Sequence, residues 1–252
     1  MPRFFISSSD VEKKISSDNS QKTFITICGD DALHITKVLR MKNGEHLTVC
    51  DTDRIEYDTV VVTTGKTVLL EAISEKKSEN DPPYRIDVYQ ALAKGERFDT
   101  VLQKSTELGA SDIIPVVTSR CTVKLEPSEY AKKIERWQRI VSEAAKQCGR
   151  TVIPIVHMPM FFEDAVREAA LCDLSLFCYE GDGTRSLRVI LDETEEMRSA
   201  SVMIGPEGGY SMVEAEFAAK AGMHMTGLGR RILRTETAAP FVLSCISYKY
   251  EL

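Results

Sequence analysis

The 252-residue sequence contains no run of 18 apolar residues, so it predicts no helix that spans a membrane. The apolar stretch near its N-terminus, Phe4–Ile6, is too short for the core of a secretory signal peptide, and we expect a cytoplasmic protein. Hydrophobic residues make up 43% and charged residues 28%, which excludes a fibrous chain and disfavours long disorder. The length fits one large domain or two small ones.

The sequence has no Cys-x-x-Cys pair, although it contains seven cysteines, an odd number. Its four histidines are dispersed, and none has a metal-ligand spacing to a cysteine. These absences favour free thiols in a reducing compartment over disulfides or a zinc site. We therefore expect no metal cofactor.

A Gly-x-Gly-x-x-Gly segment is also absent, which excludes a dinucleotide-dependent oxidoreductase of the usual doubly wound kind. The chain lacks positive charge overall, with a net charge of −6. The charge is unevenly distributed, however: residues 94–150 hold 11 basic and 8 acidic side chains, and residues 151–223 hold 5 and 13. This pattern is compatible with a patch that binds RNA, although charge alone favours an ordinary solvated surface.

Residues 1–75 are predicted to form a small β-rich domain. Four or five short strands and one helix suggest a small barrel. Asp30 or Asp31 is expected to cap the helix, whose apolar residues are Leu33, Ile35, Val38 and Leu39. The charged run 76–83 ends in two prolines and reads as a linker, so we place a domain boundary near residue 76. The strands are expected at β-branched, alternating runs: 22–28, 46–50, 59–63 and 67–73.

From residue 84 onward, strand-like runs alternate with helical ones. This alternation predicts an α/β domain, residues 76–252, with a parallel sheet covered on both faces. Ligands of such sheets bind at the carboxyl ends of the strands, here in the loops after Tyr179, Ile204 and Leu228. The strands are expected at 84–93, 112–118, 152–156, 173–179, 201–204 and 223–228, and the helices at 97–108, 130–148, 162–171, 211–221 and 235–250.

The segment Gly205–Gly209 (GPEGG) follows an apolar strand and contains three glycines. Such a loop exposes backbone N–H groups and lets a ligand approach closely, although a plain tight turn would need the same residues. Ser211 and Glu214 match a capping box, which predicts that a helix begins directly after the loop. The buried face of that helix is expected to consist of Met212, Val213 and Phe217.

A second segment, Gly227–Pro240, carries three arginines within five residues, immediately before the last predicted helix. Cations do not offset the dipole at the start of a helix, so these arginines favour an anionic partner such as RNA phosphate. Solvated surface arginines are the alternative. We expect Thr235 or Thr237 to cap the helix, and Ile232 and Leu233 to point inward.

The segments GPEGG and LGRRILRTETA, followed by a closing helix, resemble the carboxyl-terminal signature of the SPOUT methyltransferases. Four further segments extend the resemblance to the bacterial 16S ribosomal RNA uracil-N3 methyltransferases: MPRFFI, HITKVLRMKNGEHLTVCD, ALAKGERFDTVLQKSTELGASDIIPVVTSR and RWQRIVSEAAKQCGR. It implies a PUA-like β-barrel in residues 1–75 and a methyltransferase domain with a trefoil knot in residues 76–252. Because knots are very rare, no pattern of residues predicts one.

The resemblance also implies S-adenosylmethionine as the methyl donor and a homodimer whose active site lies near the subunit interface. The implied substrate is 16S ribosomal RNA within the 30S subunit. The cofactor would lie among three loops after strands. The residues expected to hold it are Glu180, Ile204, Gly205, Pro206, Glu207, Gly208, Gly209, Leu228, Gly229, Ile232, Leu233, Arg234 and Thr237.

Methylation of uracil N3 requires removal of its proton, so the site must supply a base or stabilise charge on the ring oxygens. Arg234 is the candidate for charge stabilisation, because a guanidinium donates two hydrogen bonds in a fork. Glu236 or Glu207 could be the base or could orient Arg234. Positioning alone, with solvent taking the proton, is a further possibility.

Seven cations are candidates for phosphate contacts. A non-catalytic RNA-binding or ribosome-assembly protein with a degenerate second domain is the alternative function. The intact GPEGG and LGRRILRTETA segments argue against that alternative. The candidate RNA-binding residues are Arg3, Arg40, Lys94, Arg120, Arg136, Arg139 and Arg230.

Overall fold

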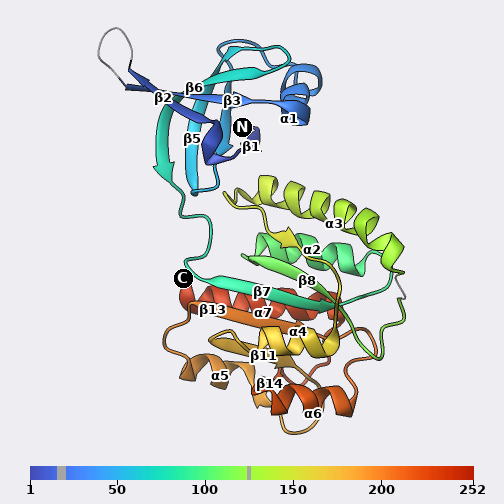
Figure 1. Cartoon of the computed structure of the whole chain (residues 1–252). Helices are drawn as coiled ribbons and strands as arrows, with labels where there is room; N and C mark the ends of the chain where they lie inside the picture. The colour runs from blue at the N-terminus through green and yellow to red at the C-terminus, as the bar shows by residue number, and fades with distance from the viewer. Residues whose placement is uncertain (16–20, 124–125) are drawn as a thin grey trace. The chain divides into compact units, whose positions relative to one another are not determined.

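The computed structural model describes residues 1–15, 21–123 and 126–252, which form two compact units (Figure 1). The first unit comprises Met1–Asp81 with Lys146–Val152, and the second comprises Pro82–Ala145 with Ile153–Leu252. The chain therefore first divides after residue 81 instead of near residue 76. The segment expected to be a linker begins as β-structure, because strand β6 extends to Lys77.

The first unit is a six-stranded sheet in the order β1-β4-β5-β6-β3-β2, with β1 parallel to β4 and the other pairs antiparallel. Alternating apolar residues, such as Ile25, Leu47 and Leu70, form its core. Strands β1 and β2 were not predicted, because one is very short and the other is polar and exposed. The strands are β1 (Arg3–Phe5), β2 (Val11–Ile15), β3 (Gln21–Ile27), β4 (His46–Cys50), β5 (Ile55–Thr63) and β6 (Val68–Lys77).

Short helices connect these strands. After the 3-10 turn η1 (Ser8–Asp10), the chain has a helix α1 (Gly29–Leu33) that continues as the π-helix η2 (His34–Val38). Of the four apolar residues of this helix, Ile35 is buried, whereas Leu33, Val38 and Leu39 are exposed. Asp30 lies in the first turn of α1, and the N-cap position is occupied by Cys28.

A distant segment of the chain completes the first unit. Arg150 Nε donates to Asp81 Oδ1 at 2.8 Å, and the Thr151 N–H donates to Asp81 Oδ2 at 3.0 Å. Asn80 Nδ2 donates to the Gly149 carbonyl at 2.9 Å. Burial opposes the charge of Asp81, but the bonds from Thr151 and Arg150 prevail and lower its pKa. This buried ion pair explains why residues 146–152 belong with a sheet far from them in sequence.

The second unit contains an eight-stranded parallel sheet in the order β10-β8-β7-β13-β11-β14-β12, with β9 paired to β8. This confirms the predicted α/β architecture. The short strands β10 and β12 were not predicted. The strands are β7 (Arg85–Ala91), β8 (Asp112–Val117), β9 (Ile155–Val156), β10 (Met160–Phe161), β11 (Leu174–Cys178), β12 (Arg185–Ser186), β13 (Ser199–Ile204) and β14 (His224–Gly227).

Helices cover both faces of this sheet (Figure 1). In β11 and β13, Leu176 and Val202 face one apolar cluster, whereas Phe177 and Met203 face the other. One cluster includes residues of α2, α3, α5 and α7, and the opposite cluster includes residues of α4 and α6. The helices are α2 (Arg97–Glu107), α3 (Pro127–Cys148), α4 (Phe162–Ala169), α5 (Leu187–Glu193), α6 (Met212–Lys220) and α7 (Thr235–Tyr250).

Helix α6 corrects one prediction. Ser211 caps it through a complete capping box with Glu214, as expected. The apolar spacing predicted the wrong buried face, because Met212 and Val213 are 69% and 77% exposed. The helix instead packs through Ala215 and Ala218, and Glu214 is buried because it bonds the loop after β8.

The sheet order places three strand ends side by side. Strand β11 lies between β13 and β14, so the loops after Cys178, Ile204 and Gly227 emerge at one edge of the sheet. Along the chain the order is β11, β13 and β14, whereas in the sheet β11 lies between the other two. The trefoil knot implied by the resemblance stays a prediction.

Candidate active site

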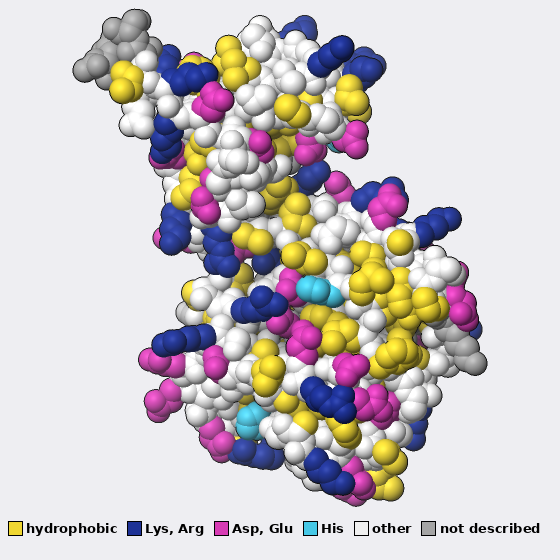
Figure 2. All heavy atoms as spheres, in the orientation of Figure 1, with side chains coloured by type: hydrophobic (Ala, Val, Ile, Leu, Met, Phe, Trp, Pro, Cys, Tyr) yellow, Lys and Arg dark blue, Asp and Glu magenta, His cyan; other side chains and the backbone are white. Residues whose placement is uncertain are grey.

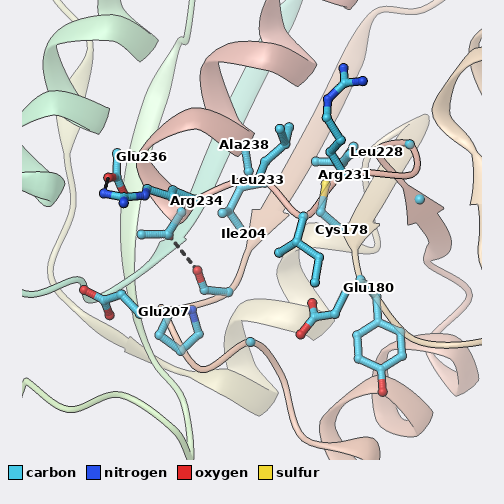
Figure 3. A pocket seen from close by; sticks show the side chains of 18 of the residues that line it. Cys178, Glu180, Ile204, Glu207, Leu228, Arg231, Leu233, Arg234, Glu236 and Ala238 are labelled. Atoms are coloured by element: carbon cyan, nitrogen blue, oxygen red, sulfur yellow. Dashed lines mark hydrogen bonds and ion pairs between the residues drawn. The ribbon is translucent and has the colours of Figure 1, made fainter.

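A cavity of about 650 Å³ opens where these three loops meet (Figure 3). Arg97 at the start of α2 and the first turn of α7 complete its wall. All residues expected to hold the cofactor line this cavity except Gly208 and Thr237. Thr237 is exposed, because α7 begins at Thr235 and turns the side chain of residue 237 away.

The glycine loop, residues 205–209, requires glycine at position 209. Gly209 has a φ of +63°, and a Cβ there would lie 2.1 Å from Glu180 Oε1. A Cβ on Gly208 would meet Arg120 Cβ at an ordinary 3.6 Å, and Gly208 has no positive φ. The structural demand for glycine therefore falls on Gly209, which lines the cavity, rather than on its neighbour.

Arg120 holds this loop from outside the cavity. Its Nη1 donates to the carbonyls of Gly208 at 3.0 Å and Tyr210 at 3.1 Å. Next to it, the N–H of Ser119 donates to Glu214 Oε1 at 2.8 Å, which ties the loop after β8 to the start of α6. We expected Arg120 to contact RNA, but in this structure its guanidinium bonds the glycine loop.

Replacement of Arg120 by alanine should weaken S-adenosylmethionine binding about fivefold. The change removes two hydrogen bonds with a charged donor, and part of their contribution of roughly 1.5–3 kcal/mol each orders the loop that lines the cavity. Titration calorimetry measures the effect, with Arg188→Ala as a control because Arg188 is 88% exposed on α5. Unchanged affinity in Arg120→Ala would show that the loop keeps its shape without this contact.

Thr235, in the wall of the cavity, joins α7 to the glycine loop and to β7. Its hydroxyl donates to the Gly205 carbonyl at 2.7 Å and accepts from Gln90 Nε2 of β7 at 2.9 Å. Helix α7 begins at Thr235, so Arg234 occupies the N-cap position, and the prediction that a threonine caps this helix is wrong. The sequence predicted Thr235 only as one of two alternative caps, and its place in the cavity wall was not predicted.

One end of the cavity gathers charged side chains (Figure 3). Glu207 Oε1 accepts from Arg97 Nη1 at 2.6 Å and from the Lys94 N–H at 2.9 Å. Glu236 Oε1 lies 3.8 Å from Arg97 Nε and 3.9 Å from Arg234 Nη1. The other carboxylate oxygen of Glu236, Oε2, is buried and finds no hydrogen-bond partner among the described residues.

The two carboxylates therefore differ. Burial opposes the charge of Glu207, but the backbone N–H groups of Lys94 and Glu207 together with Arg97 lower its pKa. Glu207 Oε1 already accepts two hydrogen bonds, whereas Glu236 Oε2 accepts none from the described residues. Of the two alternatives left open by the sequence, Glu236 is the better placed to accept a proton.

The opposite end of the cavity combines apolar side chains with the charged Glu180 and Arg231, which suits a charged nucleoside cofactor such as S-adenosylmethionine. Figure 3 shows Cys178 and Leu228 there, with the carboxylate of Glu180 beside them. Burial raises the pKa of Cys178 to about 12, so its thiol is neutral and acts as an apolar wall. Glu180 can face a cationic group, and the volume lies within the usual range for cofactor sites. The described residues include no group of three His, Cys, Asp or Glu side chains that could hold a metal ion.

Ile232 is exposed, at 85%, where an inward position was expected, although it lines the cavity. Leu233 packs against the main core, as expected. The residues that line the cavity but were not singled out as cofactor contacts include Arg97, Cys178, Thr184 and Arg231. Arg97 lies shortly after the predicted strand 84–93, and that position was the signal available in the sequence.

The expected RNA-binding residues have different surroundings. Arg3 is unsuited to phosphate contact, because its side chain is 15% exposed and pairs with Glu56 at 2.8 Å. Arg136 is bonded through both guanidinium nitrogens to Asp99. Every candidate except Arg3 is exposed, but Arg120 and Arg136 are bonded to other residues of the chain. The exposed candidates that remain are Arg40, Lys94, Arg139 and Arg230.

Basic and acidic side chains are interspersed on the face drawn in Figure 2, and no broad basic area is visible among the described residues there. No helix in the described ranges is both long and apolar enough to cross a membrane.

Comparison with known proteins follows the same division of the chain. A family described as "RNA methyltransferase domain" matches residues 80–247, and one described as "RNA methyltransferase PUA domain" matches residues 27–73. Ribosomal RNA small subunit methyltransferase E of Bacillus subtilis is 33% identical, over 90% of this chain and 91% of that protein. The protein of the same name from Mesomycoplasma hyopneumoniae is 29% identical, over 91% and 96%.

A solved structure agrees with these matches. Ribosomal RNA small subunit methyltransferase E of Neisseria gonorrhoeae, bound to S-adenosyl methionine, is 28% identical with a TM-score of 0.82. The similarity covers 99% of this chain and 98% of that one. The chain therefore belongs to the ribosomal RNA small subunit methyltransferase E family of RNA methyltransferases, with a PUA-like domain in front of the α/β methyltransferase domain.

Proposed function

We propose that this enzyme transfers a methyl group from S-adenosylmethionine to N3 of a uridine in 16S ribosomal RNA. The observation that carries the proposal is the cavity itself. Its end at Cys178 and Leu228 suits the cofactor, and its other end sets a carboxylate, Glu236, beside the guanidinium of Arg234. The names of the relatives support small-subunit ribosomal RNA as the substrate.

The protein side chains divide the work of this reaction. When bound, S-adenosylmethionine supplies an electrophilic methyl group. Arg234 donates hydrogen bonds to a ring oxygen of uracil, where negative charge develops as N3 loses its proton. Glu236 accepts that proton. Glu207 accepts hydrogen bonds from the Lys94 N–H and from Arg97, and so keeps Arg97 in place. The methyl group then bonds to N3.

We further propose that the substrate is the assembled 30S subunit, that the protein acts in the cytoplasm and that it is a homodimer. The most direct test maps methylated nucleotides in ribosomal RNA from cells with and without the protein. One N3-methyluridine of 16S RNA should disappear without it. Purified enzyme should methylate 30S subunits faster than free 16S RNA, and ultracentrifugation should show a dimer. Retention of every modification in the deletion strain would refute the proposal.

Arg139 provides a test of the RNA contact. Its side chain is 75% exposed on α3, and its one ion pair in the described chain, with Glu135, is long at 3.6 Å. If it meets a phosphate, Arg139→Gln should reduce the slope of log affinity against log salt by roughly one. Filter binding to 30S subunits at several salt concentrations measures the slope. A slope equal to that of the parent would make Arg139 part of a solvated helix face.

A further inference from the structure

The carboxylate of Glu236 lies between two guanidinium groups that come from separate elements. Arg97 reaches it from α2, with Nε at 3.8 Å from Oε1, and Arg234 reaches it from the loop before α7, with Nη1 at 3.9 Å from the same oxygen. Both distances exceed a hydrogen bond, so Glu236 does not saturate the N–H groups of either arginine. The arrangement is a row of donor, acceptor and donor.

Four hydrogen bonds hold Arg97 and Glu236 of this row in place. Arg97 Nη1 is bonded to Glu207 Oε1 at 2.6 Å, and the backbone N–H of Lys94 holds the same oxygen. Glu236 sits in the first turn of α7, directly after Thr235, whose hydroxyl is bonded at both sides. The two ends of the row are accessible, because the side chains of Arg97 and Arg234 are 41% and 80% exposed, whereas the side chain of Glu236 between them is 19% exposed.

The pairing edge of uracil has the complementary pattern. It presents the carbonyl oxygen O4, the N3–H group and the carbonyl oxygen O2, which are acceptor, donor and acceptor in turn. Cytosine presents an amino donor, a bare N3 acceptor and O2. Its amino group would face a guanidinium and its N3 lone pair would face a carboxylate, so two of three contacts would repel.

We propose that Arg97, Glu236 and Arg234 together read the pairing edge of uracil, with each arginine donating to one ring oxygen and Glu236 accepting from N3–H. Arg97 is then a specificity-determining residue of the reaction, and this inference rests on the proposed function. As the N3–H bond breaks, its proton goes to Glu236 and the negative charge spreads onto O2 and O4, beside the two guanidiniums. N3 bonds to the methyl carbon, and the electron pair of the broken carbon–sulfur bond stays on sulfur.

The test pairs protein variants with altered bases. 30S subunits are reconstituted with 16S RNA that carries uridine, 2-thiouridine, 4-thiouridine or cytidine at the target position, and single-turnover rates are measured. Sulfur is a weaker acceptor than oxygen, so the parent enzyme should lose about tenfold for each thio base and should not methylate cytidine. The single-turnover rate of Arg97→Gln should be the same with one of the two thio bases as with uridine, and the rate of Arg234→Gln should be the same with the other thio base as with uridine.

Three comparisons make the outcome decisive. Arg188→Gln, at an exposed position of α5, should lose the same rate as the parent with each thio base. If Arg97→Gln is too slow to measure, Arg97→Lys replaces it, because lysine keeps the positive charge. Circular dichroism should give the spectrum and melting temperature of the parent in every variant, which shows that each is folded. Variants of Arg97 and Arg234 that both stay sensitive to both thio bases would overturn this inference and leave the proposed function intact. A parent enzyme inactive on uridine would overturn the proposed function instead, and with it this inference.

Discussion

Methylation of 30S subunits should slow about 100- to 1000-fold when Arg234 is replaced by lysine. The substitution keeps the positive charge but loses the planar fork that, in the mechanism we propose, donates to the uracil edge in the transition state. Arg234 contributes little to folding, because its side chain is 80% exposed and makes no capping hydrogen bond to the described residues. The loss should therefore fall on the chemical step.

Single-turnover kinetics at saturating cofactor and RNA measure this loss, since they separate the chemical step from product release. Arg230→Lys is the comparison, because Arg230 lines the same cavity and a phosphate contact needs only its charge. It should lose far less than Arg234→Lys. Equal, mild losses in the two variants would show that Arg234 is a general electrostatic contact, and another donor would have to stabilise the uracil charge.

Replacement of Gly209 by alanine should weaken S-adenosylmethionine binding about 10- to 100-fold. Left-handed backbone costs a residue with a Cβ roughly 1–2 kcal/mol, and Gly209 has a φ of +63°. The new Cβ would also lie 2.1 Å from Glu180 Oε1, so the Glu180 side chain would have to move from its place in the cavity wall.

Gly208→Ala is the matched control, because it adds the same methyl group one residue earlier in the same loop. Its backbone φ is not positive, and its Cβ would make only ordinary contact, so affinity should change less than twofold. Calorimetry measures both affinities, and circular dichroism checks folding. Similar losses in the two variants would mean that loop flexibility, and not the geometry at Gly209, governs binding.

Local patterns located most elements of the second unit. The predicted last helix, 235–250, coincides with α7, and the capping box at Ser211 and Glu214 is present as expected. These features are set by neighbouring residues, which is why spacing reveals them. The same spacing failed for Met212 and Val213, because the partner of α6 is chosen by the packing of other elements, and small alanines face it.

Residue spacing predicted the alternation of strands and helices and the loop segments that line the cavity, and the family resemblance supplied the reaction. How those segments meet followed only from the folded chain. Strand order brought the three loops together, and Arg97, far from Glu236 in sequence, came within 3.8 Å of it. Likewise, Asp81 and Arg150 form a buried pair that no pattern could show. Residue types and spacing encode local geometry, whereas long-range pairs depend on which surfaces the folded chain buries together.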